Sequence, residues 1–173
     1  MSDSKLLKVP NKEAAAVELA VFDFDGVFTD NTVYVNDKGE ETVRCWRGDG
    51  LGLTRLKNAG VKIWVISTEK NPVVLKRCRK LSISCKTGVS DKAKTLNNLT
   101  KDLKIPLANT AFVGNDINDI EPLKIASLAI AVQDAENETK KAALYQTKKS
   151  GGFGAVREIC DWIVACKNYK MKN

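Results

Sequence analysis

Two aspartates set two residues apart stand near the start of the chain, in VFDFDGVFTD (21–30). Alternate residues of an extended strand face the same side, so the carboxylates of Asp23 and Asp25 point in one direction. An uncompensated carboxylate in a buried strand is costly, and a cation or a chemical task usually explains such a pair. Both residues lie at the C-terminal end of the expected strand, where open α/β sheets bind their ligands. The pair therefore predicts a functional site.

Three later segments place polar groups where an apolar strand ends or a helix begins. In a parallel sheet such strand ends converge on one edge. Carboxylate, hydroxyl, ammonium and amide groups gathered there suit one phosphoryl group and one Mg²⁺, a hard cation that prefers oxygen ligands. The residues concerned are Ser67 and Thr68 after the run 61–66, Lys92 at an expected helix start, and Asn115, Asp116 and Asp119 after the run 110–113.

The chemistry that this set could perform is the hydrolysis of a phosphate monoester. One aspartate can act as the nucleophile and form an aspartyl-phosphate. Mg²⁺ and a lysine can offset the negative charge that spreads over the transferring group. A second aspartate can protonate the leaving oxygen and later activate water.

The composition excludes several other kinds of site. The chain of 173 residues has no histidine, which removes Ser-His-Asp and Cys-His catalysis and His-ligated zinc. Its net charge of +7 comes from scattered basic residues without interleaved aromatic residues, so we expect no nucleic-acid partner. No apolar run approaches the roughly 20 residues that cross a bilayer, and the N-terminus lacks a signal-peptide core. The five cysteines, an odd number without a CxxC pair, predict reduced thiols and a cytoplasmic location.

Strands and helices alternate with short connections, so we expect an α/β fold with one domain and a central parallel sheet flanked by helices. Residues 1–17 are expected to form an N-terminal arm and residues 18–173 the domain. Residues 31–46 alternate around the turn Asn36-Asp37-Lys38-Gly39, which predicts a β-hairpin that hangs over the site as a flap. The expected strands cover 19–24, 61–66, 82–85, 110–113 and 128–132, and the expected helices cover 49–58, 72–81, 91–103, 119–125, 136–143 and 154–167.

Four segments resemble, in order, the motifs of the haloacid dehalogenase-like superfamily: DFDGVFTD (23–30), VIST (65–68), SDK (90–92) and GNDIND (114–119). The resemblance spans nearly the whole chain and implies a Rossmann-like domain with Mg²⁺ as cofactor. The implied roles are nucleophile for Asp23, general acid and base for Asp25, phosphate binding for Ser67 and Thr68, charge stabilisation for Lys92, and metal binding for Asp23, the Asp25 backbone carbonyl, and Asn115 or Asp116.

Finer features resemble the 3-deoxy-D-manno-octulosonate 8-phosphate phosphatase family, whose relatives include nonulosonate 9-phosphate phosphatases and a domain of some CMP-sialate synthetases. These features are RGDGLGL (47–53), Arg77 before CRKLSI, and GGFGAVRE (151–158). The resemblance implies a capless subunit, a homotetramer in which flaps and C-terminal tails close neighbouring sites, and a phosphorylated 2-keto-3-deoxy sugar acid as substrate. Glu69 and an arginine, Arg77 or Arg157 from a neighbouring subunit, would bind that substrate, and Glu69 directly after VIST favours a nine-carbon sugar acid.

One departure from the family pattern concerns the metal. The fourth motif commonly reads GDD, whereas Asn115 replaces the first acid with an amide that can coordinate Mg²⁺ but adds no charge. The alternative is a non-catalytic or weakly active oligomerisation domain that partners a sialate cytidylyltransferase. Simpler roles also stay open, namely a helix cap for Ser67 or Thr68, a solvated lysine for Lys92, and surface ion pairs for Glu69, Arg77 and Arg157.

Overall fold

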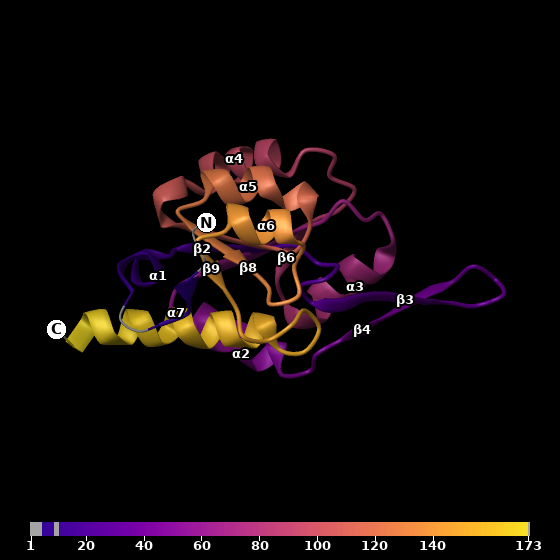
Figure 1. The fold of residues 1–173 in the computed structure, drawn as a ribbon, viewed down its shortest axis with the longest axis horizontal. Helices are drawn as coiled ribbons and strands as arrows, with labels where there is room; N and C mark the ends of the chain where they lie inside the picture. Colours follow the sequence, from indigo (N-terminus) through magenta and orange to yellow (C-terminus); the bar gives the residue numbers. More distant parts are fainter. Residues whose placement is uncertain (1–4, 9–10, 173) are drawn as a thin grey trace.

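A parallel sheet forms the centre of the protein in the computed structural model, which describes residues 5–8 and 11–172 (Figure 1). Its seven strands follow the order β1-β9-β8-β7-β2-β5-β6, and every neighbouring pair is parallel. This arrangement confirms the predicted α/β class. The strands are β1 (Lys5–Leu6), β2 (Leu19–Phe22), β5 (Lys62–Ile66), β6 (Ser84–Lys86), β7 (Thr110–Gly114), β8 (Leu128–Ala131) and β9 (Tyr145–Gln146).

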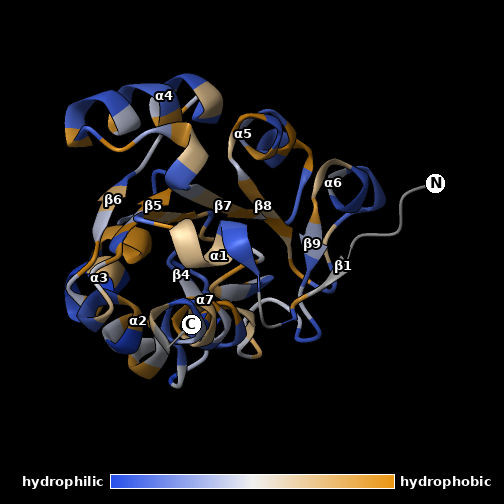
Figure 2. Cartoon of the chain, turned by 90° about the vertical axis from the view of Figure 1, so that its left-hand side faces the viewer, coloured by the Kyte–Doolittle hydropathy of each residue, from blue (hydrophilic) through white to orange (hydrophobic). Residues whose placement is uncertain are grey.

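Helices cover both faces of the sheet, with α4, α5 and α6 on one side and α1, α2, α3 and α7 on the other (Figure 2). They are α1 (Lys12–Ala16), α2 (Asp49–Asn58), α3 (Pro72–Leu81), α4 (Lys92–Leu103), α5 (Ile120–Ile125), α6 (Asn137–Ala142) and α7 (Ala155–Lys172), with short 3₁₀ turns η1 (Leu107–Asn109) and η2 (Ile117–Asp119). None of the described helices has the length and apolar character needed to cross a membrane.

The central strand β2 is apolar along its whole length because both faces of the sheet are covered. Its side chains alternate between two cores. Ala20 and Phe22 join the core formed with α2, α3 and α7, whereas Leu19 and Val21 join the core formed with α4 and α5. The strand is thus held firmly at the position from which the aspartate loop emerges.

The flap is a separate two-stranded hairpin of β3 (Thr29–Val35) and β4 (Glu41–Cys45) that extends away from the domain (Figure 1). Asn36 closes its turn, because the side-chain oxygen accepts hydrogen bonds from the backbone N–H groups of Lys38, at 3.0 Å, and Glu40, at 2.9 Å. Gly39 has a φ of +76°, a conformation that glycine adopts without strain. The predicted hairpin is confirmed, whereas its placement over the site stays a prediction.

The chain differs from the sequence expectation mainly at short elements. The first strand ends at Phe22 rather than Phe24, because the carbonyl of Phe24 turns to accept backbone N–H groups of Val27 and Phe28. Within the expected arm, β1 pairs with β9 and α1 packs on α7, while residues 1–4 and 9–10 lie outside the described residues. Two-residue strands carry no periodic pattern, so β1 and β9 could not be predicted.

A buried carboxylate links the starts of α2 and α7. Asp49 is 1% exposed, and its Oδ1 accepts a hydrogen bond from the backbone N–H of Arg157 at 3.1 Å. Its Oδ2 is buried without a hydrogen-bond partner. Burial raises the pKa of Asp49 from 3.8 to about 6, against the opposing effects of the Arg157 bond and the charge of Arg77. The ionised form therefore carries a cost in the folded protein.

This cost predicts a pH-dependent effect of Asp49→Asn on stability. Since the folded pKa is raised, the unfolded chain loses its proton first, and Asp49 lowers the stability progressively as the pH rises from about 4 to about 6. Asn keeps an acceptor for Arg157 but carries no charge. We expect the free energy of unfolding of the variant, relative to the parent, to increase by roughly 2 kcal/mol between pH 4.5 and 7.5.

Urea unfolding of both proteins at the two pH values measures this difference. Asp49→Ala serves as the control, because it removes the acceptor as well and is expected to be less stable than Asp49→Asn at either pH. A difference between Asp49→Asn and the parent that stays constant with pH would contradict the prediction.

Candidate functional site

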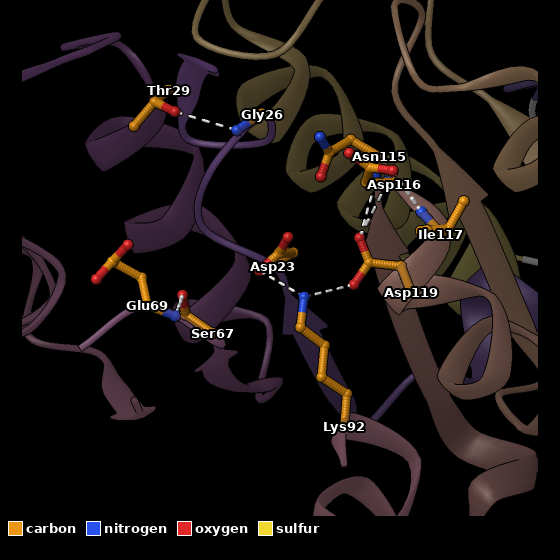
Figure 3. A network of polar contacts seen from close by, with 10 residues as sticks. All are labelled: Asp23, Gly26, Thr29, Ser67, Glu69, Lys92, Asn115, Asp116, Ile117 and Asp119. Carbon is orange, nitrogen blue, oxygen red and sulfur yellow. Dashed lines mark hydrogen bonds and ion pairs between the residues drawn. The ribbon is translucent and has the colours of Figure 1, made fainter. Parts of the chain in front are cut away.

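Three neighbouring strands bring predicted residues to one edge of the sheet (Figure 3). Asp23 follows β2, Ser67 follows β5 and Asn115 follows β7, and these strands lie in the order β7-β2-β5. Lys92, the first residue of α4, reaches the same place, with its Nζ 2.8 Å from Asp23 Oδ1. The right-handed alternation of strands and helices therefore gathers groups that are up to 92 positions apart in the numbering, from Asp23 to Asn115.

Lys92 lies buried between two carboxylates, 2.8 Å from Asp23 and 2.7 Å from Asp119. Burial by itself lowers the pKa of Lys92, but the two carboxylates outweigh it and raise this pKa above its ordinary value. Burial and the charge of Asp119 raise the pKa of Asp23 to about 7, against the attraction of Lys92. Lys92 is thus a stable ammonium, whereas the ionisation of Asp23 responds to any further positive charge beside it.

Asp119 also fixes the loop after β7. Its Oδ2 accepts hydrogen bonds from the backbone N–H groups of Asn115, at 2.9 Å, and Asp116, at 3.4 Å. The side chain lies so close to Gly114 that an added Cβ there would come within 2.6 Å of the carboxyl carbon. The sequence analysis placed Asp119 among the strand-end groups but gave it no role. The only local sign of its contact with the backbone of Asn115 is their separation of four residues.

Asp25 lies in a tight turn at the root of the flap. Gly26 has a φ of +77°, and its N–H donates to Thr29 Oγ1 at 3.1 Å. An added Cβ at Gly26 would overlap the side chain of Asn115, so the position requires glycine. Burial and the charge of Glu69 raise the pKa of Asp25, and Lys92 opposes the shift. A raised pKa makes the carboxyl of Asp25 easier to protonate, as a general acid requires.

The side chain of Asn115 closes a small cluster of oxygens. Its inner amide atom lies 2.9 Å from the carbonyl oxygen of Asp25 and 3.3 Å from Asp23 Oδ2. With the amide nitrogen at that position the side chain donates to both oxygens, and with the amide oxygen there three oxygens face one another, which only a cation stabilises. Adjacent ligands of an octahedral Mg²⁺, with bonds of about 2.1 Å, are about 3 Å apart, so the spacing fits this ion.

Carboxylates alone do not form this cluster. In the part of the chain that the structure describes, no group of three His, Cys, Asp or Glu side chains could hold a metal ion. The carboxylate of Asp116 instead accepts the backbone N–H of Ile117 at 2.7 Å and caps η2. A cation at this edge would therefore use Asn115 and a backbone carbonyl in addition to Asp23.

The loop after β5 offers a hydroxyl whose hydrogen is available. Ser67 is buried, and its Oγ accepts the N–H of Glu69 at 3.1 Å, which leaves the hydroxyl hydrogen for another acceptor. Thr68 is exposed beside it. The carboxylate of Glu69 accepts the N–H groups of Lys70 and Asn71 at 2.6 and 2.7 Å, so it stabilises the turn into α3.

The two predicted arginines lie in different places. Arg77 lies beside Trp46 at the end of the flap, and Arg157 lies between α2 and α7. Arg77 donates from Nη2 to the carbonyl of Trp46 at 3.3 Å, and its Nε is buried without a partner. Arg157 donates from Nε to Asp161 at 2.6 Å and from Nη1 to Gly48 O at 3.5 Å. These contacts engage Arg157 within its own subunit, between α2 and α7, and the structure does not bring it to Asp23.

Comparisons with known proteins agree on one family. A model of the haloacid dehalogenase-like hydrolases matches residues 82–159. The 3-deoxy-D-manno-octulosonate 8-phosphate phosphatase KdsC of Escherichia coli (strain K12) is 33% identical over 153 residues, which are 88% of this chain and 81% of that protein.

Solved structures match over almost the whole chain. The 3-deoxy-D-manno-octulosonate 8-phosphate phosphatase of Moraxella catarrhalis, in complex with a magnesium ion, a phosphate ion and KDO, is 33% identical with a TM-score of 0.88 and covers 93% of both chains. The cobalt-bound phosphatase YrbI of Haemophilus influenzae is 27% identical with a TM-score of 0.87, covering 91% of this chain and 92% of that one. The chain therefore belongs to the haloacid dehalogenase-like hydrolases and, within them, to the 3-deoxy-D-manno-octulosonate 8-phosphate phosphatase family.

Proposed function

We propose that this protein is a Mg²⁺-dependent phosphatase that hydrolyses the phosphate monoester of a 2-keto-3-deoxy sugar acid. The observation that carries the proposal is the buried Lys92 ammonium that holds Asp23 beside the oxygens of Asp25 and Asn115. The KdsC relatives are named for octulosonate 8-phosphate, and the Moraxella catarrhalis enzyme was solved with magnesium, phosphate and KDO. These names support an eight-carbon substrate, whereas Glu69 in the sequence favours a nine-carbon one.

In this proposal the reaction has two steps. Asp23 attacks phosphorus, forming the Asp23–phosphorus bond as the bond from phosphorus to the sugar oxygen breaks, while Asp25 gives its proton to that oxygen. In the second step Asp25 takes a proton from a water molecule, and the water oxygen attacks phosphorus. The bond between phosphorus and the Asp23 oxygen breaks, which releases inorganic phosphate and restores Asp23. Lys92 offsets the charge on the transferring group, and the hydroxyl hydrogens of Ser67 and Thr68 donate to its oxygens.

Mg²⁺ would be held by Asp23, the Asp25 carbonyl and Asn115, where it supplies positive charge to the phosphoryl oxygens. Such a charge would also lower the pKa of Asp23 and keep the carboxylate ionised, as a nucleophile must be. Asp116, the other predicted ligand, has its carboxylate engaged by Ile117.

We expect Mg²⁺-dependent release of inorganic phosphate from octulosonate 8-phosphate or a nonulosonate 9-phosphate, with much slower release from simple sugar phosphates. Asp23→Asn should lower this rate at least about a thousandfold because it removes the nucleophile. Lys92 keeps Asp119 as a partner in this variant, so its fold can be checked by circular dichroism. Full turnover by Asp23→Asn would exclude the mechanism, and equal low rates on all substrates would exclude the sugar-acid specificity.

Asn115→Asp tests the metal assignment. The added carboxylate gives the oxygen cluster another negative charge, so we expect the dissociation constant for Mg²⁺, measured by titration calorimetry, to fall about tenfold. Asp116→Asn is the matched control, because its carboxylate caps η2, and we expect an unchanged dissociation constant. Unchanged or weaker Mg²⁺ binding by Asn115→Asp would contradict the assignment.

We also propose the homotetramer and the cytoplasmic location. Val33, Tyr34 and Val35 on the flap are each more than half exposed, and a contact with another subunit would cover them. All five cysteines are free thiols, which suits a reducing compartment. Binding to a sialate cytidylyltransferase stays a prediction.

Light scattering after size exclusion should give four times the subunit mass of 19.0 kDa. Val33→Asp with Val35→Asp should shift the protein to smaller species, because charges are costly in an apolar interface. Asn98→Asp, at an exposed position on α4 outside the flap, is the control for added charge. A mass of one subunit for the parent protein would contradict the tetramer.

A further inference from the structure

The flap is tied to the loop after β5 by a single side-chain hydrogen bond. Asn71 donates from Nδ2 to Glu41 Oε2 at 2.9 Å. Glu41 is the first residue of β4, while Asn71 is the N-cap of α3 and follows the Ser67–Lys70 segment. The bond therefore connects the flap with the predicted phosphate-binding loop.

The amide of Asn71 is held in one orientation. Its side-chain oxygen accepts the N–H of Val73 at 3.0 Å, as an N-cap does, and its own backbone N–H donates to Glu69 at 2.7 Å. With the oxygen engaged by the helix, the side-chain nitrogen points to the flap. The helix start thus fixes where the carboxylate of Glu41 lies.

Glu41 is connected to the predicted phosphate-binding residue Ser67 through Asn71 and Glu69. The backbone N–H of Asn71 donates to Glu69 Oε1 at 2.7 Å, and the backbone N–H of Glu69 donates to Ser67 Oγ at 3.1 Å. In addition to burial, the negative charge of Glu69 and, more weakly, that of Glu41 raise the pKa of Asp25. Asp25 is the residue proposed to protonate the leaving oxygen. A carboxylate near this point repels the acid group of a sugar acid but accepts hydrogen bonds from hydroxyl groups. Glu41 is exposed, and one of its oxygens accepts from Asn71, so the other can accept from a ligand.

We propose that Glu41 is a specificity-determining residue whose carboxylate, positioned by Asn71, accepts hydrogen bonds from hydroxyl groups of the leaving sugar. The inference rests on the phosphatase function proposed above and adds the part of the substrate that the flap recognises. It predicts that loss of Glu41 affects a polyhydroxylated substrate more than one whose leaving group carries no hydroxyl.

The test compares kcat/KM for octulosonate 8-phosphate with kcat/KM for phenyl phosphate in the parent, Glu41→Ala and Glu41→Gln. We expect the ratio of the two values to fall about tenfold in Glu41→Ala, since a hydrogen bond to a charged group is lost. Glu41→Gln keeps an acceptor without the charge, and we expect a fall of about threefold.

Two further variants separate recognition from flap folding. Glu40→Gln makes the same chemical change one residue earlier, where the carboxylate accepts from Asn36 within the turn, and should leave the ratio unchanged. Asn71→Ser keeps a helix cap but removes the donor to Glu41, so it should lower the ratio in the same direction as Glu41→Ala.

The outcomes distinguish this inference from the function on which it rests. Parental activity with an unchanged ratio in Glu41→Ala, or with equal losses on both substrates, would overturn the inference and leave the phosphatase function intact. A parent protein that hydrolyses neither substrate would overturn both.

Discussion

The ammonium of Lys92 is the contact on which the geometry of the predicted site depends. It is buried with Asp23 and Asp119, and so connects the loop after β2 with the start of the segment after β7. A buried charge costs several kcal/mol unless partners and hydrogen bonds compensate it. Neither loop can move away without leaving an unpaired charge in the interior. The ion pairs therefore fix the loops to each other, although such pairs are weak evidence for overall stability.

This arrangement brings the backbone of the loop after β2 close to the backbone of the loop after β7. Once Asp119 is held by Lys92, it lies against Gly114, and its second oxygen holds the backbone N–H of Asn115. Asn115 in turn lies against Gly26, in the turn that carries Asp25. Two glycines without side chains thus let the two loops meet at the distances of shared metal ligands. Larger residues at either position would separate the oxygens by more than an octahedral cation allows.

The sequence was sufficient for the sheet class and for the convergence of Asp23, Ser67, Lys92 and Asn115, because both follow from strand polarity and crossover handedness. It was not sufficient where a role depends on which partner a side chain meets. The guanidinium of Arg157 is engaged within its own subunit by Asp161 and Gly48, and its predicted role toward the substrate of a neighbouring subunit stays a prediction. The contact of Glu41 with Asn71 joins residues 30 positions apart on different elements, and no local pattern signals it. The strand β9 and its pairing with β1 were missed for the same reason, since two residues show no period.

The strand-end site and the flap are held in place by different kinds of contact. The groups predicted for phosphoryl chemistry lie on strand ends enclosed by two apolar cores, where neighbouring charges raise or lower each pKa. The flap shares no ladder with the central sheet, and most residues of its strands are exposed. Its position therefore depends on a few contacts, those of Val43 and Cys45 with the core and of Arg44 with Phe153 near its root, and that of Glu41 with Asn71 farther along. Such contacts can change between related chains without disturbing the core, because their loss exposes no buried charge. Recognition of the leaving group can thus vary on the flap while the phosphoryl site stays constant.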